Sequence, residues 1–193
     1  LIKQIVKLKD IKFYEGLGTI YDKTQRLRKL SGMLADEFNI NKEKAEIAAS
    51  ISKSDLCSDL VNEYPDLQGL MGKYFATSQG FEEDVSNAVS DHYLPLGNNS
   101  IPAKKPISYT VAITDKIDSL VGFFLINEKP TSSKDPFALR RSAIGLLRTI
   151  IDNKLNLKLR NLISFNIKLF EEQGVKKINE NSENEILNFL KER

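Results

Sequence analysis

The sequence contains very little of the residue types that most metal sites and many catalytic sites need. Histidine occurs once, as His92, and cysteine occurs once. Zinc sites generally need more imidazole or thiolate groups than this chain supplies, and a Ser-His-Asp triad or a Cys-His pair would have to use His92 itself. These classes of enzyme are therefore nearly excluded, and His92 is expected to be a structural residue at a helix end. The single cysteine also excludes an intramolecular disulfide.

Long apolar runs and a strong charge of one sign are missing too. No run approaches the roughly 20 residues of a membrane span, and no signal-peptide pattern is present. We therefore expect a cytoplasmic protein without a membrane partner. Lys and Arg number 28 against 26 Asp and Glu, a net charge of +2 that favours neither nucleic acid nor a membrane surface. The first residue is leucine, which suggests a piece of a longer protein.

Apolar residues recur at helical spacing in almost every segment, and strand-type alternation is scarce. The pattern therefore predicts an all-α protein. Proline and glycine predict loops at 95–106 and 127–134. The expected helices cover 42–62 after an Asn41 cap, 65–72 from Pro65, 108–124, about 135–152, and one or two segments of 155–193 divided by the polar stretch 176–184.

The helix expected from Asp135, with Pro136 at its first position, has a basic face. Helical spacing places Arg140, Ile144 and Arg148 on one line, with Arg141 adjacent and Lys134 just before the helix. Guanidinium groups match phosphate geometry, so this face is a candidate phosphate contact, and a solvated helix face is the alternative. A further alternative is a buried ion pair with Asp115 or Asp118. The residues expected to face the core are Phe137, Leu147, Ile150 and Ile151.

Other patterns that could bind ligands are weak. Asp115 and Asp118 are three residues apart with Lys116 between them, which is common on a solvated helix face. Two carboxylates without histidine would bind Mg²⁺ only weakly. The glycines at 16–18 and 69–72 lack the Lys-Ser/Thr of a phosphate loop, so they indicate turns and close packing.

Six motifs occur in an order that resembles a known family. They are FYEGLGT at 13–19, KSDL at 53–56, EYPDLQGLMG at 63–72, HYLP at 92–95, DKIDSLVG at 115–122 and PTSSKDPFALRR at 130–141. Together they resemble the central region of the bacterial glycyl-tRNA synthetase beta subunits. The resemblance covers about residues 10–152, and residues 153–193 are assigned by continuity alone.

The resemblance implies an HD-domain-like helical bundle with a C-terminal helical extension. The implied division is an entry segment at 1–19, an HD-like domain at 20–152 and a helical extension at 153–193. Active HD enzymes build a metal site from a histidine, a His-Asp pair and a later aspartate. Lys53 and Asp55 would stand where that pair belongs, Asp115 would be the later aspartate, and His92 lies outside the expected positions. We therefore expect the fold without a metal or the hydrolase activity.

The resemblance also implies a two-component ligase that charges tRNA(Gly) with glycine. ATP and Mg²⁺ would be used by the alpha subunit, and this chain would hold no catalytic residue and no cofactor. Its partners would be tRNA(Gly), the alpha subunit and the remainder of the beta subunit, with Lys134, Arg140, Arg141 and Arg148 as tRNA contacts. The alternatives are an active metal-dependent HD phosphohydrolase and a purely protein-binding scaffold.

Overall fold

The computed structural model describes residues 1–97, 99–131, 133–176 and 179–193, and residues 98, 132 and 177–178 of the expected loops lie outside this set. Its described residues form helices and one two-stranded antiparallel sheet, which confirms the all-α class. The first half contains η1 (Ile2–Asp10), β1 (Lys12–Tyr14), β2 (Gly18–Thr19), α1 (Ile20–Phe38), α2 (Lys42–Ile51), η2 (Ser54–Cys57), α3 (Asp59–Glu63), η3 (Pro65–Leu67), α4 (Leu70–Ser78) and α5 (Glu83–Asp91). The second half contains α6 (Pro106–Leu125), α7 (Leu139–Asp152), α8 (Leu159–Glu172) and α9 (Ser182–Lys191).

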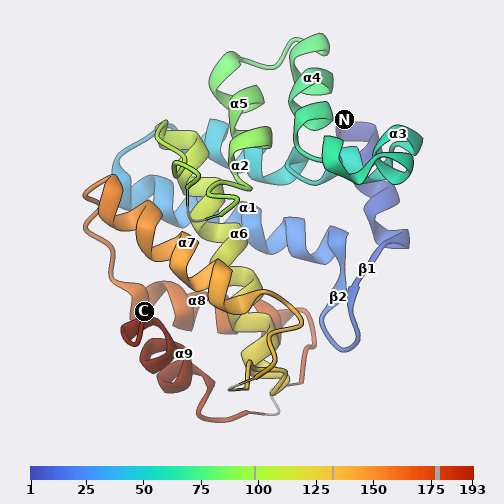
Figure 1. Ribbon diagram of the computed structural model, residues 1–193. Helices are drawn as coiled ribbons and strands as arrows, with labels where there is room; N and C mark the ends of the chain where they lie inside the picture. Colours follow the sequence, from blue (N-terminus) through green and yellow to red (C-terminus); the bar gives the residue numbers. More distant parts are fainter. Residues whose placement is uncertain (98, 132, 177–178) are drawn as a thin grey trace.

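Helices α1 and α6 form the centre of the molecule, and the other helices pack around them (Figure 1). Helix α1 begins with a capping box, because the Thr19 hydroxyl accepts from the Asp22 N–H and the Asp22 carboxylate accepts from the Thr19 N–H. It ends at Asn39, whose left-handed conformation (φ 53°) stops the helix. Helix α6 starts with Pro106 in its first turn and is buried along most of its length.

Two apolar clusters form the core, and both include side chains of α1 and α6. One cluster joins these helices to α2, α4 and α5, which lie in the upper part of Figure 1. The other joins them to α7, α8 and α9, and α9 lies near the C-terminus at the bottom of Figure 1. In the second cluster Ile117 and Leu120 of α6 pack with Phe170 of α8 and Ile186 of α9.

The prediction of one helix over 42–62 is wrong at its centre. Helix α2 ends at Ile51, and a short 3-10 helix, η2, separates it from α3. The Asn41 cap at the start is confirmed, since its side chain accepts from the Lys44 N–H at 2.9 Å. Pro65 begins only a 3-10 turn, and α4 begins at Leu70, because Gly69 has a positive φ of 82° that ends the turn.

The other predicted helices are confirmed in place, with differences at their ends. The 108–124 prediction corresponds to α6, and 155–193 holds two helices, α8 and α9. Ile151 was predicted to face the core but is 69% exposed. The core-facing side of α7 is formed by Leu139, Ala143, Leu146 and Ile150. Ile151 is the next residue after Ile150, so its side chain is rotated about 100° around the helix axis, away from that side.

The helices of the described ranges include none that is both long and apolar enough to cross a lipid bilayer. The HD-like arrangement and the division at 19 and 152 stay predictions.

Candidate functional site

The interruption after α2 places a carboxylate where it can bind the start of α4. Asp55 is fully buried, and its Oδ2 accepts from the backbone N–H of Gly69 at 2.6 Å and of Gly72 at 3.2 Å. A side chain at Gly72 would collide with Val89, so the close approach of these segments requires glycine. Burial raises the pKa of Asp55, and the two N–H groups oppose that rise. The Asp55 carboxylate therefore stabilises the start of α4.

Lys53, two residues earlier, points into a buried polar cluster. Its ammonium Nζ lies 2.8 Å from Nε2 of His92 and 3.1 Å from Oδ2 of Asp115. The same ammonium lies 4.1 Å from the centre of the Tyr93 ring, a cation-π geometry. These three residues come from the end of α5 and from α6, so Lys53 connects segments that are far apart in the sequence.

The hydrogen bonds of His92 define its protonation. Nδ1 lies 2.8 Å from the Val89 carbonyl oxygen, which can only accept, so Nδ1 carries the proton. Nε2 is then the acceptor for the Lys53 ammonium. Burial, followed by the charge of Lys53, lowers the pKa of His92 well below its ordinary value. The imidazole is therefore neutral in the folded protein, and its helix-end position is confirmed.

Asp118 is fully buried and Asp115 is partly buried, and both lie against cations from α1. Lys23 Nζ lies 3.1 Å from Oδ1 of Asp115 and 3.2 Å from Oδ2 of Asp118. Arg26 donates to both oxygens of Asp118, from Nε at 2.7 Å and from Nη2 at 3.0 Å. Burial opposes the ionisation of Asp115, but the charges of Lys23 and Lys53 outweigh it and hold its pKa well below the usual range. The solvated helix face expected around Asp115 and Asp118 is therefore wrong.

Of the three positions that the resemblance implied for a lost metal site, two are brought together and one is not. Lys53 contacts Asp115, whereas the Asp55 carboxylate binds the start of α4. No group of three or more His, Cys, Asp and Glu residues that could hold a metal ion occurs within the described ranges. The residues do not fit a metal, because an ammonium group lies between the histidine and the aspartate.

Sequence reasoning missed His92, Lys23 and Arg26 as members of this cluster. A local signal existed for Lys23, which lies four residues before Leu27 on the buried face of α1. His92 had no such signal, because its partner Lys53 is 39 residues away. The alternative of an ion pair between an arginine of α7 and Asp115 or Asp118 is wrong. The two carboxylates pair with Lys23, Arg26 and Lys53 instead.

The start of α7 differs from its prediction. The helix begins at Leu139, after Ala138 in the left-handed conformation (φ 52°), and not at Pro136. Asp135 still caps it from outside: its carboxylate accepts from the N–H groups of Leu139 at 2.8 Å and Arg140 at 2.9 Å. The first helical N–H groups are thus bound by a carboxylate, as the macrodipole favours.

The four predicted basic residues have different surroundings. Arg148 donates to the carbonyl oxygens of Gly97 at 3.1 Å and Ser100 at 2.8 Å, and so holds the loop between α5 and α6. The Arg140 guanidinium donates to the carbonyls of Thr131 and Lys134. Arg141 and the Lys134 side chain are exposed, and neither has a hydrogen bond or ion pair among the residues that the structure describes.

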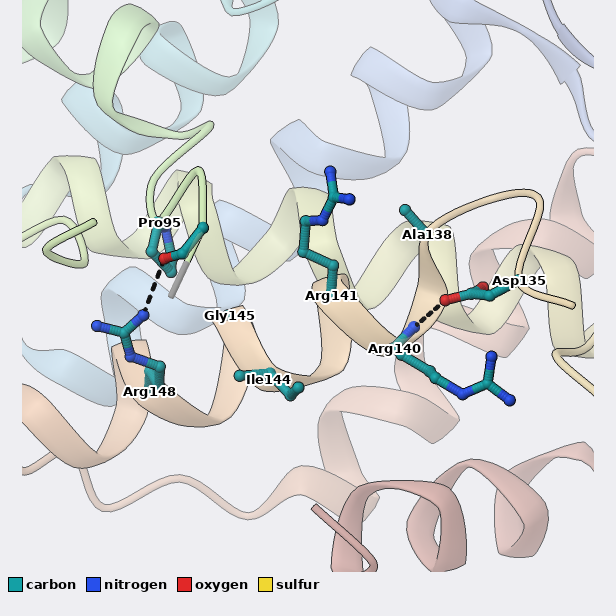
Figure 2. A pocket seen from close by; sticks show the side chains of 9 residues that line it. Pro95, Asp135, Ala138, Arg140, Arg141, Ile144, Gly145 and Arg148 are labelled. Atoms are coloured by element: carbon teal, nitrogen blue, oxygen red, sulfur yellow. Dashed lines mark hydrogen bonds between the residues drawn. The ribbon is translucent and has the colours of Figure 1, made fainter. Parts of the chain in front are cut away.

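Three of the four, Arg140, Arg141 and Arg148, line a surface cavity of about 420 Å³, and Lys134 is not among its lining residues (Figure 2). Figure 2 shows Arg148 directed at the loop after Pro95, and the side chains of Arg140 and Arg141 pointing in different directions. The lining residues are Pro95, Gly97, Asp135, Ala138, Arg140, Arg141, Ile144, Gly145 and Arg148. The cavity has one acidic residue, Asp135, whose carboxylate is occupied by the α7 N–H groups. Its electrostatic character is therefore positive, which favours an anion.

Three relatives of this chain share one description. The glycine-tRNA ligase beta subunit of Colwellia psychrerythraea is 44% identical over 98% of this chain. Those of Phenylobacterium zucineum and Rickettsia canadensis are 43% identical over 83% and 41% identical over 100% of it. The chain spans only about a quarter of the length of these relatives, from 24% to 27%. The family model described as glycyl-tRNA synthetase beta subunit matches residues 1–193, and the chain therefore belongs to this family.

Proposed function

We propose that this chain is a non-catalytic region of a glycine-tRNA ligase beta subunit that contributes phosphate contacts to tRNA(Gly). The observation that carries the proposal is the exposed pair of Lys134 and Arg141, which have no partner within the described ranges, beside the positive cavity at the start of α7. Cations of this kind bind phosphates without reading the base sequence. ATP and Mg²⁺ belong to the alpha subunit in this proposal, and the enzyme acts in the cytoplasm.

The surroundings of the basic residues give them different roles. Arg148 and Arg140 direct their donors at backbone carbonyls, so they shape the cavity and its neighbouring loops. Arg141 and Lys134 keep their donors available for a ligand. A phosphate contact should therefore depend mainly on Arg141 and Lys134, and folding should depend more on Arg148.

The test uses the assembled enzyme of alpha and beta subunits. Replacing Lys134 and Arg141 by Ala should weaken tRNA binding. It should also flatten the plot of log affinity against log salt by roughly 0.7 to 0.9 for each phosphate that is no longer neutralised. Glycyl-adenylate formation and thermal stability should not change. Arg28→Ala is the matched control, because Arg28 is exposed on α1 and pairs with Glu46 instead. An unchanged salt slope in the double variant would refute the phosphate contact.

A second candidate, a surface for the alpha subunit or the remainder of the beta subunit, rests on α4. Leu70 and Tyr74 lie four residues apart on this helix and are 59% and 65% exposed. Two large apolar side chains on one helix face favour contact with protein over contact with phosphate. If Leu70→Ser and Tyr74→Ser weaken subunit assembly while the tRNA salt slope is unchanged, this surface serves assembly.

An active HD phosphohydrolase has no support from the site. The position between His92 and Asp115 is taken by an ammonium group, and Asp55 binds backbone N–H groups.

A further inference from the structure

We propose that the Lys53 ammonium takes the place of a metal ion between His92 and Asp115, so that this cluster is a closed cation site. The three groups meet inside the protein, where Lys53 is 6% exposed and His92 is fully buried. A divalent metal enters this site only when the ammonium has been removed.

The first argument is the chemistry of the two acceptors. His92 presents an unprotonated Nε2, because Nδ1 donates to the Val89 carbonyl, and Asp115 presents a carboxylate oxygen. A neutral imidazole oriented by a backbone carbonyl and an ionised carboxylate are the donors that transition metals bind. Here both are directed at the same atom, Nζ of Lys53, at 2.8 and 3.1 Å.

The second argument is that the Lys53 ammonium occupies the space between the two ligands and engages both of them. An ammonium group has three donors and no acceptor. Lys53 gives two of them to His92 and Asp115 and lies 4.1 Å from the centre of the Tyr93 ring. The distances suit hydrogen bonds, whereas zinc would need its ligands at about 2.0 to 2.2 Å. A metal and the ammonium cannot occupy the site together, because both are cations that would share the same two ligands.

The third argument is the charge around the site. Lys23 binds the other oxygen of Asp115, and the Lys116 ammonium donates to the carbonyls of His92 and Leu94. Two ammonium groups therefore contact the Asp115 carboxylate, and a third is bound to the backbone of His92 and Leu94. A divalent ion would add further positive charge to this group, so removal of the Lys53 charge is a condition for metal binding.

The experiment restores a third metal ligand at position 53. Purified Lys53→His should bind one equivalent of Zn²⁺ and give a Co²⁺ absorption spectrum. His92→Gln in that background should weaken Zn²⁺ binding by at least about tenfold, since even changes to outer-shell partners cost this much. The unsubstituted protein should bind no more Zn²⁺ than His92→Gln alone. Folded Lys53→His that binds no additional metal would overturn the proposal, as would His92-dependent metal binding by the unsubstituted protein.

A second variant covers the case in which Lys53→His does not fold. Lys53→Ala leaves a cavity between His92 and Asp115 that a small alkylammonium ion can enter. Its melting temperature should rise in propylammonium chloride compared with sodium chloride at equal concentration. Lys42→Ala, which removes an exposed lysine paired with Asp36, should show no such difference. The absence of any rise with propylammonium would mean that the position is not a cation site.

Discussion

Buried charges of individual residues are balanced in two different ways around α6. Asp118 has no exposed side-chain surface, and it neutralises Arg26, which also stacks on the Phe170 ring at 3.8 Å. Lys116 is bound by two carbonyl oxygens, and burial lowers its pKa to about 8. Carbonyl dipoles compensate the lost hydration of an ammonium less completely than a full negative charge does. Lys116 therefore holds its proton less firmly than an exposed lysine.

His92 should make the stability of the protein depend on pH. Its pKa is lowered in the folded state, mainly by burial, while in the unfolded chain it stays near the ordinary value of about 6.5. Between these values the unfolded chain binds a proton that the folded protein does not. The contribution of neutral His92 is thus fully present above about pH 6.5 and is lost as the pH falls towards the folded-state pKa. The titratable and charged groups around His92 are Lys53, Asp115, Lys116 and Tyr93. A substitution of His92 alone leaves all four in place.

Urea unfolding of the unsubstituted protein and of His92→Gln between about pH 5 and pH 7 measures this contribution. The free energy of unfolding should fall more steeply towards low pH when the histidine is present. Equal slopes for the two proteins would show that His92 takes up a proton in the folded state without cost.

At the scale of elements, the start of α7 depends on a carboxylate four residues before the helix. Asp135→Ala should lower the free energy of unfolding by about 0.5 to 2 kcal/mol, because the N–H groups of Leu139 and Arg140 lose their acceptor. Asp135→Asn retains an acceptor and should lose less. Asp10→Ala, at an exposed position, is the control. Denaturant midpoints measure all three, and equal losses for Asp135→Ala and Asp10→Ala would exclude a capping role.

How far an element could be predicted depended on where its stabilising contacts come from. Helix α6 was predicted well, because its periodic apolar residues are a local signal, although Pro106, which begins the helix, was assigned to the preceding loop. The break after α2 was not predicted, because Asp55 binds N–H groups 14 and 17 residues later in the chain. The ammonium between His92 and Asp115 was missed for the same reason. The resemblance to the family, and not sequence spacing, singled out Lys53 and Asp55, whereas Asp115 was also noted from its spacing to Asp118.

For the whole molecule, residues that follow position 152 pack in the same core as α1 and α6, and the implied division at 152 stays a prediction. Leu162, Ile163 and Phe170 of α8 pack in the same apolar cluster as α6. A side chain at Gly122 of α6 would lie 2.9 Å from the Phe170 ring, so the two helices approach closely. Gln173 accepts a hydrogen bond from the buried guanidinium of Arg26. The segment 153–193 therefore completes the structure around α1 and α6.

A chain that ends at residue 152 should consequently lose its cooperative unfolding transition. Removal of α8 and α9 would expose the apolar face of α6 and leave Arg26 without its ring and amide partners. Circular dichroism in the near and far ultraviolet during heating measures the effect: helical signal should remain in part, while the tertiary signal and the sharp transition disappear. A chain that ends at residue 190 is the control, since it keeps Leu190 and loses only exposed residues. If the chain ending at residue 152 unfolds as sharply as this control, residues 20–152 form an independent domain.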